Sequence, residues 1–264
     1  MSQNVLVVHG GGPTAVINAS LYGVIEEAKR NPEVGKVYGA IGGTGAIFSE
    51  TFIDLTSFDD EKLKLLLHTP ASAIGSSRYP LYEKDYEKMV DIFKKHDIKY
   101  VLLNGGNGTM DACGHIYEVC KDQDIKVVGI PKTIDNDIAM TDHSPGYGSA
   151  ARFIAASTQE VGEDVKSLPI HVCIMEAMGR NAGWITAASA LARRKQGDAP
   201  HLIYLPERNF NEDEFLEDVS RLQKKQGGVV VLVSEGLHDA NGESIVPPIF
   251  KSERAVYYGD VSSH

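Results

Sequence analysis

Short apolar runs rich in Val and Ile alternate with amphipathic helical stretches along almost the whole 264-residue chain. The runs expected to form strands cover residues 4–10, 36–42, 98–104, 125–130, 170–175, 201–206 and 227–233. The expected helices cover residues 13–30, 59–68, 83–96, 108–121, 148–165, 180–194 and 211–225. Apolar strands separated by helices pack as a parallel sheet that is covered on both faces. The pattern therefore predicts an α/β fold with a doubly wound, Rossmann-like parallel sheet.

A polar, turn-rich segment near the middle of the chain, "AMTDHSPGYGSA" (139–150), is where we expect one lobe to end and a second to begin. We place the boundary after residue 140, which gives a first, larger lobe of residues 1–140 and a second, smaller α/β lobe of residues 141–264. Close to the C-terminus, Asp260 or Ser262 would make a good N-cap for a helix that does not follow. We therefore expect the chain to be incomplete.

Composition excludes several classes of partner. A formal net charge of −10 argues against nucleic acid and anionic membrane surfaces, although a phosphate pocket is local and needs only a few cations. No apolar run reaches the roughly 18 residues of a membrane-spanning helix, and the start "MSQNVLVVHGGG" enters a strand without a signal peptide. Cys113, Cys120 and Cys173 cannot all pair and form no CxxC, which indicates reduced thiols in a cytoplasmic protein.

Two glycine-rich loops each follow an expected strand and precede an expected helix. They read "HGGGPT" (9–14), where Pro13 or Thr14 is expected to open the helix, and "NGGNGT" (104–109). Unpaired N–H groups and the helix dipole favour an anion at such a turn, and glycine lets a polyphosphate approach the backbone. Neither loop fits GxGxxG with its distal acid or the P-loop pattern. Either loop alone could simply be a tight turn, but two in one sheet favour an extended phosphate chain.

The segment "GIPKTIDNDI" (129–138) carries the strongest chemical signal. An apolar strand runs directly into Lys132, Thr133, Asp135 and Asp137. Two carboxylates two residues apart can serve different partners, one accepting a proton and one facing a metal ion, while the lysine neutralises phosphate charge. A solvated turn is the alternative, since Asp and Asn are common in turns.

A second dense motif, "IMEAMGRNAGWITAASALA", covers residues 174–192. A strand ends near Glu176, and we expect Met178, Gly179 and Arg180 to open a small-residue helix. A carboxylate can bind sugar hydroxyls, and an arginine can clamp a phosphate. Met178 or Trp184 alone would more often belong to a core than to a site.

At these residues the chain resembles the 6-phosphofructokinase family. The segments that carry the resemblance occur in that family's order and span almost the whole chain: "GGGPTAVINA", "GSSRYP", "GGNGT", "PKTIDNDI", "DHSPGYGSA", "MEAMGRNAGW" and "LVSEGL". "PKTIDND" and "MGRNAGW" are highly specific, whereas "GGNGT" is shared loosely with NAD and lipid kinases. The resemblance implies a phosphotransferase of glycolysis that uses Mg²⁺ and either ATP or pyrophosphate to phosphorylate the 1-hydroxyl of fructose 6-phosphate. It also implies a donor on a large Rossmann-like lobe, the sugar phosphate across a cleft, and dimers or tetramers that share sites.

Roles carry over residue by residue. Asp135 resembles the catalytic base, with Thr133 beside the transferring phosphate and Lys132 near its charge, while Asp137 and Asn107 resemble the residues that serve Mg²⁺. The resemblance implies a donor-phosphate surface of Gly11, Arg78, Gly106, Asn107, Gly108 and Thr109. It implies a sugar-phosphate surface of Glu176, Met178, Gly179, Arg180, Glu235 and His171. In-line transfer is mostly positioning and charge stabilisation, which such a set can supply.

Several positions depart from the family pattern. Asn107 stands where an acid is usual, so it keeps an oxygen ligand but loses the charge. Gly108 leaves room for a nucleotide, whereas Lys132 is typical of pyrophosphate enzymes and of some that use ATP. From these conflicting clues we favour ATP, with pyrophosphate as the alternative donor. His171 stands where the family commonly has a cation that reaches a neighbouring subunit's sugar phosphate.

Two other readings stay open. Family members run well past the position of His264, so a truncated or impaired homologue that binds phosphorylated ligands without catalysis is one alternative. An NAD- or lipid-kinase-like enzyme is another, but it explains only the "GGNGT" loop.

Overall fold

The computed structural model describes residues 3–14, 16–246, 248–251, 256–258 and 261. The chain folds into two compact units, Met1–Thr133 and Ile134–His264, of which the second is only marginally the shorter. Each unit has its own sheet and its own apolar clusters. The alternating pattern of the sequence is therefore confirmed as an α/β fold.

The division falls after Thr133, seven residues before the boundary that we expected from the turn-rich segment. The reason lies in hydrogen bonds on either side. The backbone N–H of Lys132 donates to the Gly105 carbonyl oxygen at 2.9 Å, which ties it to the first unit. The Asn136 side chain instead accepts from the Ser144 N–H at 2.7 Å. The Ser144 carbonyl oxygen in turn accepts from the N–H of Tyr147 at 3.1 Å, and Tyr147 begins a helix of the second unit.

The first unit is built around a five-stranded sheet. Its elements are β1 (Gln3–Gly10), α1 (Ile17–Arg30), β2 (Val34–Ala40), α2 (Gly45–Phe48), β3 (Phe52–Asp54), η1 (Leu55–Ser57), α3 (Asp60–Lys64), η2 (Leu65–Leu67), α4 (Glu83–Lys95), β4 (Ile98–Gly105), α5 (Asn107–Cys120) and β5 (Lys126–Pro131). The strand order is β3-β2-β1-β4-β5, and β3 alone runs antiparallel to its neighbour. In β1 every residue after Gln3 is buried, because helices cover both faces of the sheet.

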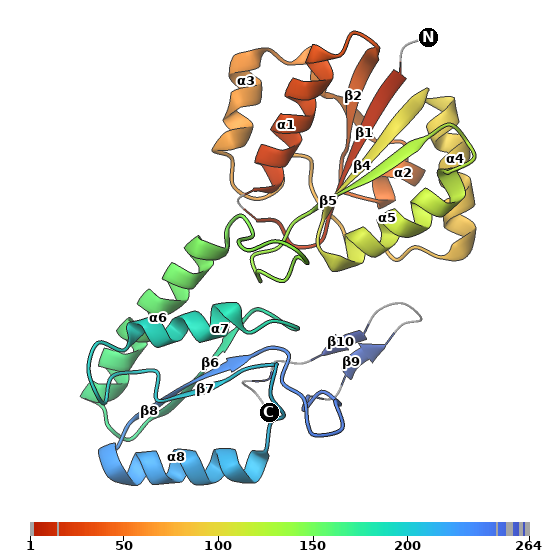
Figure 1. The fold of residues 1–264 in the computed structure, drawn as a ribbon. Coiled ribbons are helices and arrows are strands. Elements are labelled where there is room, and N and C mark those ends of the chain that lie inside the picture. The colour runs from red at the N-terminus through yellow and green to blue at the C-terminus, as the bar shows by residue number, and fades with distance from the viewer. Residues whose placement is uncertain (1–2, 15, 247, 252–255, 259–260, 262–264) are drawn as a thin grey trace. The chain divides into compact units, whose positions relative to one another are not determined.

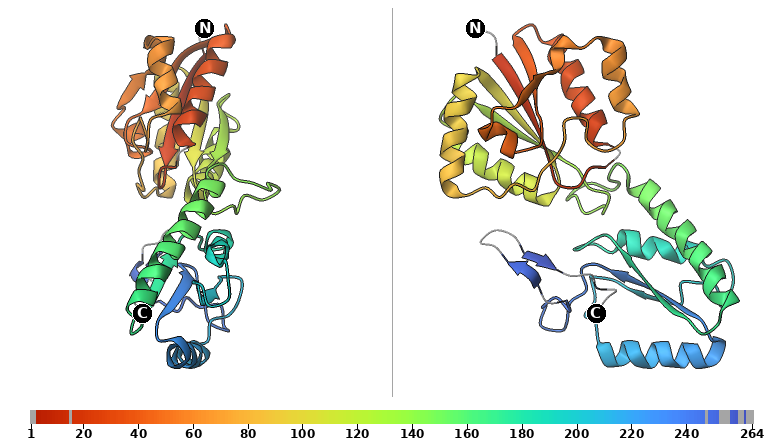
Figure 2. Two further views of the ribbon diagram at one scale, coloured as in Figure 1. Left: turned by 90° about the vertical axis from the view of Figure 1, so that its left-hand side faces the viewer. Right: turned by 180° about the vertical axis from the view of Figure 1, so that it is seen from behind.

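Two apolar clusters lie on opposite faces of this sheet. Leu6 and Val8 of β1 pack with residues of α2, α4 and α5, whereas Val5 and Val7 pack with residues of α1 and α3. Figures 1 and 2 show the helices in these two layers. The alternation of β1 side chains between the two clusters fixes the sheet register, since a shift of one residue would exchange the faces.

The second unit has a smaller sheet. Its elements are α6 (Tyr147–Ser167), β6 (Val172–Ala177), α7 (Trp184–Ala188), η3 (Ser189–Ala192), β7 (Leu202–Tyr204), α8 (Glu212–Gln226), β8 (Val229–Ser234), β9 (Pro248–Lys251) and β10 (Val256–Tyr258). The order β6-β8-β7 is parallel, and β9 and β10 form an antiparallel pair. Val230 and Leu232 pack toward α6, and Val229, Val231 and Val233 pack toward α8, as the layers in Figure 1 show.

Two helices begin later than the sequence predicted. Helix α1 starts at Ile17 rather than at Pro13 or Thr14, because the backbone of the preceding glycines is bonded to neighbouring loops. Helix α7 starts at Trp184 rather than near Arg180, since the residues after β6 form a turn.

Two further expectations concern the chain end and the membrane. Asp260 and Ser262, the expected capping residues, lie outside the described residues. Among the residues that the structure describes, no helix has the length and apolar character needed to cross a membrane.

Candidate functional site

The parallel strands of the first unit end together at one edge of the sheet. Gly10 of β1 is paired with Gly105 of β4, which is paired with Pro131 of β5. The chain moves from β1 outward to β2 and later returns to the other side of β1 as β4, so the strand order reverses between β1 and β4. Ligands of open α/β sheets bind outside the carboxyl ends of the strands at such a reversal. The two glycine loops follow these two strands, so the topology places both at this position.

The side chain of Thr109 packs against both glycine loops. It lies in the first turn of α5, and only 8% of its surface is exposed. A Cβ atom on Gly10 or Gly105 would collide with the Thr109 hydroxyl group, and one on Gly105 would also lie 2.6 Å from the Gly10 carbonyl oxygen. Close packing of the loops thus requires these glycines. A direct role of Thr109 toward phosphate stays a prediction.

Lys132 joins the two loops. Its side chain is buried, its backbone N–H donates to the Gly105 carbonyl oxygen at 2.9 Å, and its ammonium group donates to the Gly12 carbonyl oxygen. Gly11, the residue before Gly12, has a φ of 72°, a conformation that glycine adopts readily. The structure therefore places Lys132, Gly11 and the second glycine loop within one small region.

A third loop, residues 75–78, lies against the first glycine loop. The N–H of Gly11 donates to the Ser77 carbonyl oxygen at 3.1 Å, and the Ser76 hydroxyl donates to the Gly11 carbonyl oxygen at 2.6 Å. Arg78 is the next residue and is exposed. The predicted donor-phosphate residues of the first unit are thus brought together by backbone contacts.

The open part of this region is at the start of α5. Gly106 caps the helix without a side-chain hydrogen bond, and Asn107 and Gly108 are exposed. A Cβ atom on Gly108 would have no other atom within 4 Å. The helix dipole and backbone N–H groups at such a start favour an anion, and the phosphate-binding role of Gly106, Asn107 and Gly108 stays a prediction.

The acidic motif lies at the start of the second unit. Asp135 and Asp137 flank Asn136, which is buried and has a φ of 61°. The Asn136 side chain donates to the Asp142 carbonyl oxygen at 3.3 Å and accepts from the Ser144 N–H at 2.7 Å. This clamp fixes the backbone between the two carboxylates, so a solvated turn is not the whole explanation of the motif. Sequence reasoning did not give Asn136 this role, although Asn is a common left-handed residue.

The second predicted surface forms where β6 and β8 end. The Gly179 N–H donates to a Glu235 carboxylate oxygen at 3.1 Å, and the Ser234 hydroxyl donates to the Gly179 carbonyl oxygen at 2.7 Å. Arg180 lies 3.8 Å from the other Glu235 oxygen, with both side chains partly exposed. Gly179 has a φ of 117°, and a Cβ atom there would collide with the Ala182 carbonyl oxygen. The structure thus brings together Gly179, Arg180 and Glu235.

The remaining predicted residues of this surface lie apart or point to solvent. Met178 is exposed beside Gly179, and Glu176 lies within β6. His171 precedes the first residue of β6, at the opposite end of the strand. Six strand residues span about 20 Å, so His171 does not join Gly179 within one chain.

Sequence reasoning missed His9, the last side chain before the first glycine loop. It is fully buried, with Nδ1 2.7 Å from the Ser72 Oγ atom and Nε2 3.3 Å from the Asn104 Nδ2 atom. Burial, followed by the charge of Lys132, lowers the pKa of His9 to about 4. A polar residue that ends an otherwise apolar buried strand was the available signal.

The family model for "Phosphofructokinase" matches residues 4–260 of the chain. The chain belongs to the phosphofructokinase family. The resemblance stated from the motifs is therefore confirmed.

Relatives and solved structures agree with this family. A curated relative from Rhodospirillum rubrum named pyrophosphate--fructose 6-phosphate 1-phosphotransferase is 42% identical over 97% of this chain and 64% of its own length. The crystal structure of a pyrophosphate-dependent phosphofructokinase from Marinobacter aquaeolei has a TM-score of 0.76 and 40% identity, and covers 90% of this chain and 61% of that one. The chain therefore spans less than two thirds of the length of these relatives.

These relatives overturn our expectation that ATP is the favoured donor. Relatives with 37–42% identity are named as pyrophosphate-dependent enzymes, whereas an ATP-dependent 6-phosphofructokinase from Amycolatopsis methanolica is 30% identical. We expected ATP because the open space at Gly108 leaves room for a nucleotide, but open space supplies no contact that binds one. Lys132, which is typical of pyrophosphate enzymes, agrees better with these relatives.

The phosphofructokinase resemblance implies Mg²⁺, and the donor set fits that ion. Asp137 offers a carboxylate and Asn107 an amide oxygen, and hard oxygen donors are what Mg²⁺ prefers. Within the described residues no group of three His, Cys, Asp or Glu side chains could hold a metal by itself. Mg²⁺ usually takes one or two carboxylates together with substrate phosphates, and the roles of Asp137 and Asn107 toward it stay predictions.

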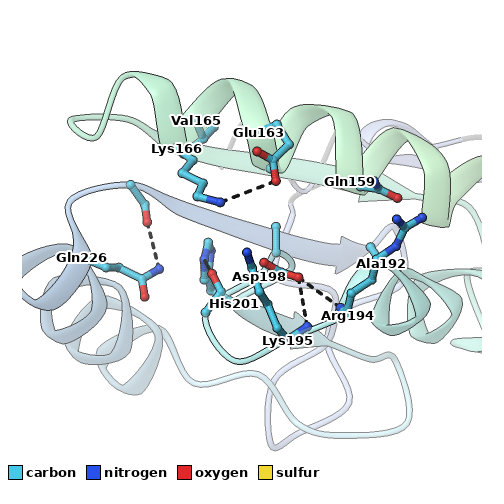
Figure 3. Close-up of a pocket in the computed structure, with 14 residues that line it drawn as sticks. Gln159, Glu163, Val165, Lys166, Ala192, Arg194, Lys195, Asp198, His201 and Gln226 are labelled. Atoms are coloured by element: carbon cyan, nitrogen blue, oxygen red, sulfur yellow. Dashed lines mark hydrogen bonds and ion pairs between the residues drawn. The ribbon is translucent and has the colours of Figure 1, made fainter.

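The second unit also contains a cavity of about 570 Å³ (Figure 3). Its walls carry charges of both signs, among them Glu163, Lys166, Arg194, Lys195 and Asp198. None of the residues predicted from the sequence lines it. It includes Gly228, which precedes β8, whereas Glu235 follows the other end of that strand. The cavity is thus distinct from the surface around Gly179.

Proposed function

We propose that this protein transfers a phosphoryl group from pyrophosphate to the 1-hydroxyl of fructose 6-phosphate. Membership of the phosphofructokinase family supports the reaction class, and the relatives with 37–42% identity support pyrophosphate as the donor. The observation that carries the proposal is the convergence of two glycine loops and Lys132 at the strand-order reversal of the first unit.

In this proposal the first unit binds pyrophosphate. Exposed backbone at Gly12 and Gly108, the N-terminus of α5 and the exposed Arg78 supply favourable charge and N–H groups for the pyrophosphate anion. Lys132 sets the distance between the glycine loops through its bonds to Gly12 and Gly105. These groups are in place before the ligand binds, so little reorganisation is needed when charge shifts during transfer.

The acidic motif performs the proton transfer. Asp135 accepts the proton of the sugar hydroxyl while the hydroxyl oxygen attacks phosphorus, the bridging P–O bond of pyrophosphate breaks, and orthophosphate leaves. Thr133 hydrogen-bonds the transferring phosphoryl group. Asp137 and Asn107 would hold Mg²⁺, which neutralises charge on the phosphate oxygens when bound. Asn136 holds the backbone between the carboxylates through Asp142 and Ser144.

The sugar phosphate is assigned to the surface of Gly179, Arg180 and Glu235. Glu235 can accept hydrogen bonds from sugar hydroxyls, and Arg180 can bind phosphate. Met178 contributes an exposed apolar contact, and Glu176 lies at the edge. His171 is assigned to the site of a second subunit in a dimer or tetramer, which its exposed position at the far end of β6 supports.

A coupled assay with fructose 6-phosphate, Mg²⁺ and either donor tests the proposal. We expect turnover with pyrophosphate and at least about tenfold lower kcat/KM with ATP. Higher efficiency with ATP would reject the donor assignment. Turnover of another phosphorylated sugar in place of fructose 6-phosphate would reject the acceptor.

Binding without catalysis is a second candidate function, because the chain spans only 64% of the Rhodospirillum rubrum relative. Isothermal titration with pyrophosphate, run beside the assay, separates the two. Binding without turnover with either donor would favour this second function, and absence of binding would reject both.

A further inference from the structure

The buried side chain of His9 contacts two segments that are far away in the sequence. Its Nδ1 atom is 2.7 Å from the Ser72 Oγ atom, and its Nε2 atom is 3.3 Å from the Asn104 Nδ2 atom. His9 and Asn104 are paired residues on β1 and β4, and each precedes a glycine loop. Ser72 lies in the turn that leads to Arg78.

The partners of His9 define which ring nitrogen carries its proton. Asn104 Nδ2 donates to the Ile17 carbonyl oxygen at 3.0 Å, which fixes the amide so that its second hydrogen points to His9 Nε2. The Ser72 hydroxyl donates to the Gly75 carbonyl oxygen at 2.6 Å, so its oxygen is left to accept a hydrogen bond. Nε2 is therefore the acceptor, and Nδ1–H is the donor.

A neutral ring is the only form that satisfies both contacts. A proton on Nε2 would face the Asn104 amino group, which is itself a donor. Burial and the charge of Lys132 oppose a positive charge in the same sense, and they lower the pKa of His9 to about 4. His9 thus stays neutral at the pH at which most enzymes work, so it acts by hydrogen bonding and not by charge.

The bond to Ser72 bears directly on the loop that carries Arg78. Ser72 holds the Gly75 carbonyl group, and the following serines bond to the backbone of Gly11. The Asn18 side chain donates to the carbonyl oxygens of Thr69 and Ala71 and accepts from the Ala73 N–H at 2.8 Å, so it holds the turn on both sides of Ser72. Ser72 itself is bonded to His9, which connects the strand edge to the turn that leads into residues 75–78.

We propose that His9 is a positioning residue of the donor-phosphate surface. Its Nδ1–H bond to Ser72 sets where residues 75–78 lie beside the glycine loops, and it thereby sets the position of Arg78 for pyrophosphate. This inference rests on the proposed function, and it adds a residue that touches neither phosphate nor sugar. It predicts that loss of the bond raises the KM for pyrophosphate and leaves the KM for fructose 6-phosphate unchanged.

Two substitutions at one position separate the two hydrogen bonds. In His9→Asn the amide nitrogen takes the place of Nδ1 and keeps the bond to Ser72. In His9→Gln the amide oxygen takes the place of Nε2 and keeps the bond to Asn104. Ser72→Ala removes the same contact with His9, together with the bond from Ser72 to Gly75, from a partly exposed position, so it tests the loop's position even where a change at His9 impairs folding.

We expect His9→Gln and Ser72→Ala each to raise KM for pyrophosphate about fivefold, with kcat and KM for fructose 6-phosphate within about twofold of wild type. His9→Asn is expected to keep the KM for pyrophosphate within about twofold. Equal effects of His9→Gln and His9→Asn, or a parallel rise of both KM values, would overturn the inference.

Hydrogen exchange keeps this test independent of the proposed function. Amides of residues 72–78 should exchange faster in His9→Gln than in His9→Asn, whether or not the protein turns over pyrophosphate. A wild-type protein that is inactive with pyrophosphate, together with this exchange difference, would reject the donor and keep the positioning role. Equal exchange in the two variants would reject the positioning role itself.

Discussion

Asp135 is the side chain on which the proposed proton transfer depends. It precedes Asn136, whose left-handed backbone and two side-chain bonds fix the direction of the chain at this point. General-base catalysis contributes about 10²- to 10⁴-fold, so we expect Asp135→Asn to lower kcat by about 10³-fold. The Kd for pyrophosphate should stay within about threefold, because donor binding is assigned to other residues. Steady-state kinetics and isothermal titration measure the two quantities.

A matched control is available in the same segment. Asp142 is an exposed acid whose backbone carbonyl group, and not its side chain, is bonded to Asn136. Asp142→Asn removes the same charge and should leave kcat within about twofold. A loss of pyrophosphate affinity in Asp135→Asn as large as its loss of kcat would assign Asp135 to binding instead.

The buried imidazole of His9 makes a second prediction, which concerns stability. Its folded-state pKa of about 4 is below the ordinary 6.5, so the unfolded chain binds the proton more readily. The stability that the neutral ring contributes is full above pH 6.5 and is lost as the pH falls toward 4. Linkage gives a loss of about 2 kcal/mol between pH 8 and pH 5.

Urea unfolding of wild type and His9→Asn at both pH values checks this. Wild type should lose about 2 kcal/mol more than the variant, since asparagine does not titrate in this range. Equal losses would mean that His9 takes up its proton as readily in the folded protein as in the unfolded chain, which would also contradict its hydrogen-bond assignment.

At the scale of the structural element, glycines of the same loop have different physical roles. Gly105→Ala places a Cβ atom against the buried Thr109 side chain and within 2.6 Å of the Gly10 carbonyl oxygen, which belongs to the neighbouring strand. We expect a loss of about 2 kcal/mol or more in the free energy of unfolding. Urea denaturation followed by circular dichroism measures it.

Gly108→Ala is the matched control, three residues further along. Beyond the neighbouring residues of the helix itself, nothing lies within 4 Å of the added Cβ atom, and the position is helical. Alanine should therefore leave stability unchanged or raise it by about 0.5–1 kcal/mol. If both variants were equally destabilised, the packing account of the loop would be wrong.

Predictability from the sequence differs between the body of an element and its ends. Strands such as β4 and β8 could be predicted because burial on both faces demands continuous apolar residues. The starts of α1 and α7 could not, because long-range contacts decide them. Ser76 and Ser77 hold the loop before α1, and Glu207 accepts from the Gly183 N–H at the start of α7.

The same reasoning applies to the site at the scale of the whole molecule. Motifs gave most of the candidate residues because their chemistry is local, as with the acids around Asn136. They did not give His9, whose role depends on a serine 63 residues away and an asparagine 95 residues away. The division of the structure after Thr133 likewise depends on the hydrogen bonds that Lys132 and Asn136 make with other segments.

The proposal divides the ligands between the two units, and hydrogen exchange of the whole chain tests that division. Pyrophosphate with Mg²⁺ should slow exchange at residues 9–12, 75–78 and 104–109, because these loops form the donor surface. Fructose 6-phosphate should instead slow exchange at residues 178–182 and 234–236. A ligand at 100 times its Kd reduces the open population by about 100-fold, so the protection should be large at these amides. Sulfate at the same concentration serves as the control for nonspecific anion binding. Protection of residues 178–182 by pyrophosphate, in place of the glycine loops, would reverse the assignment of donor and acceptor.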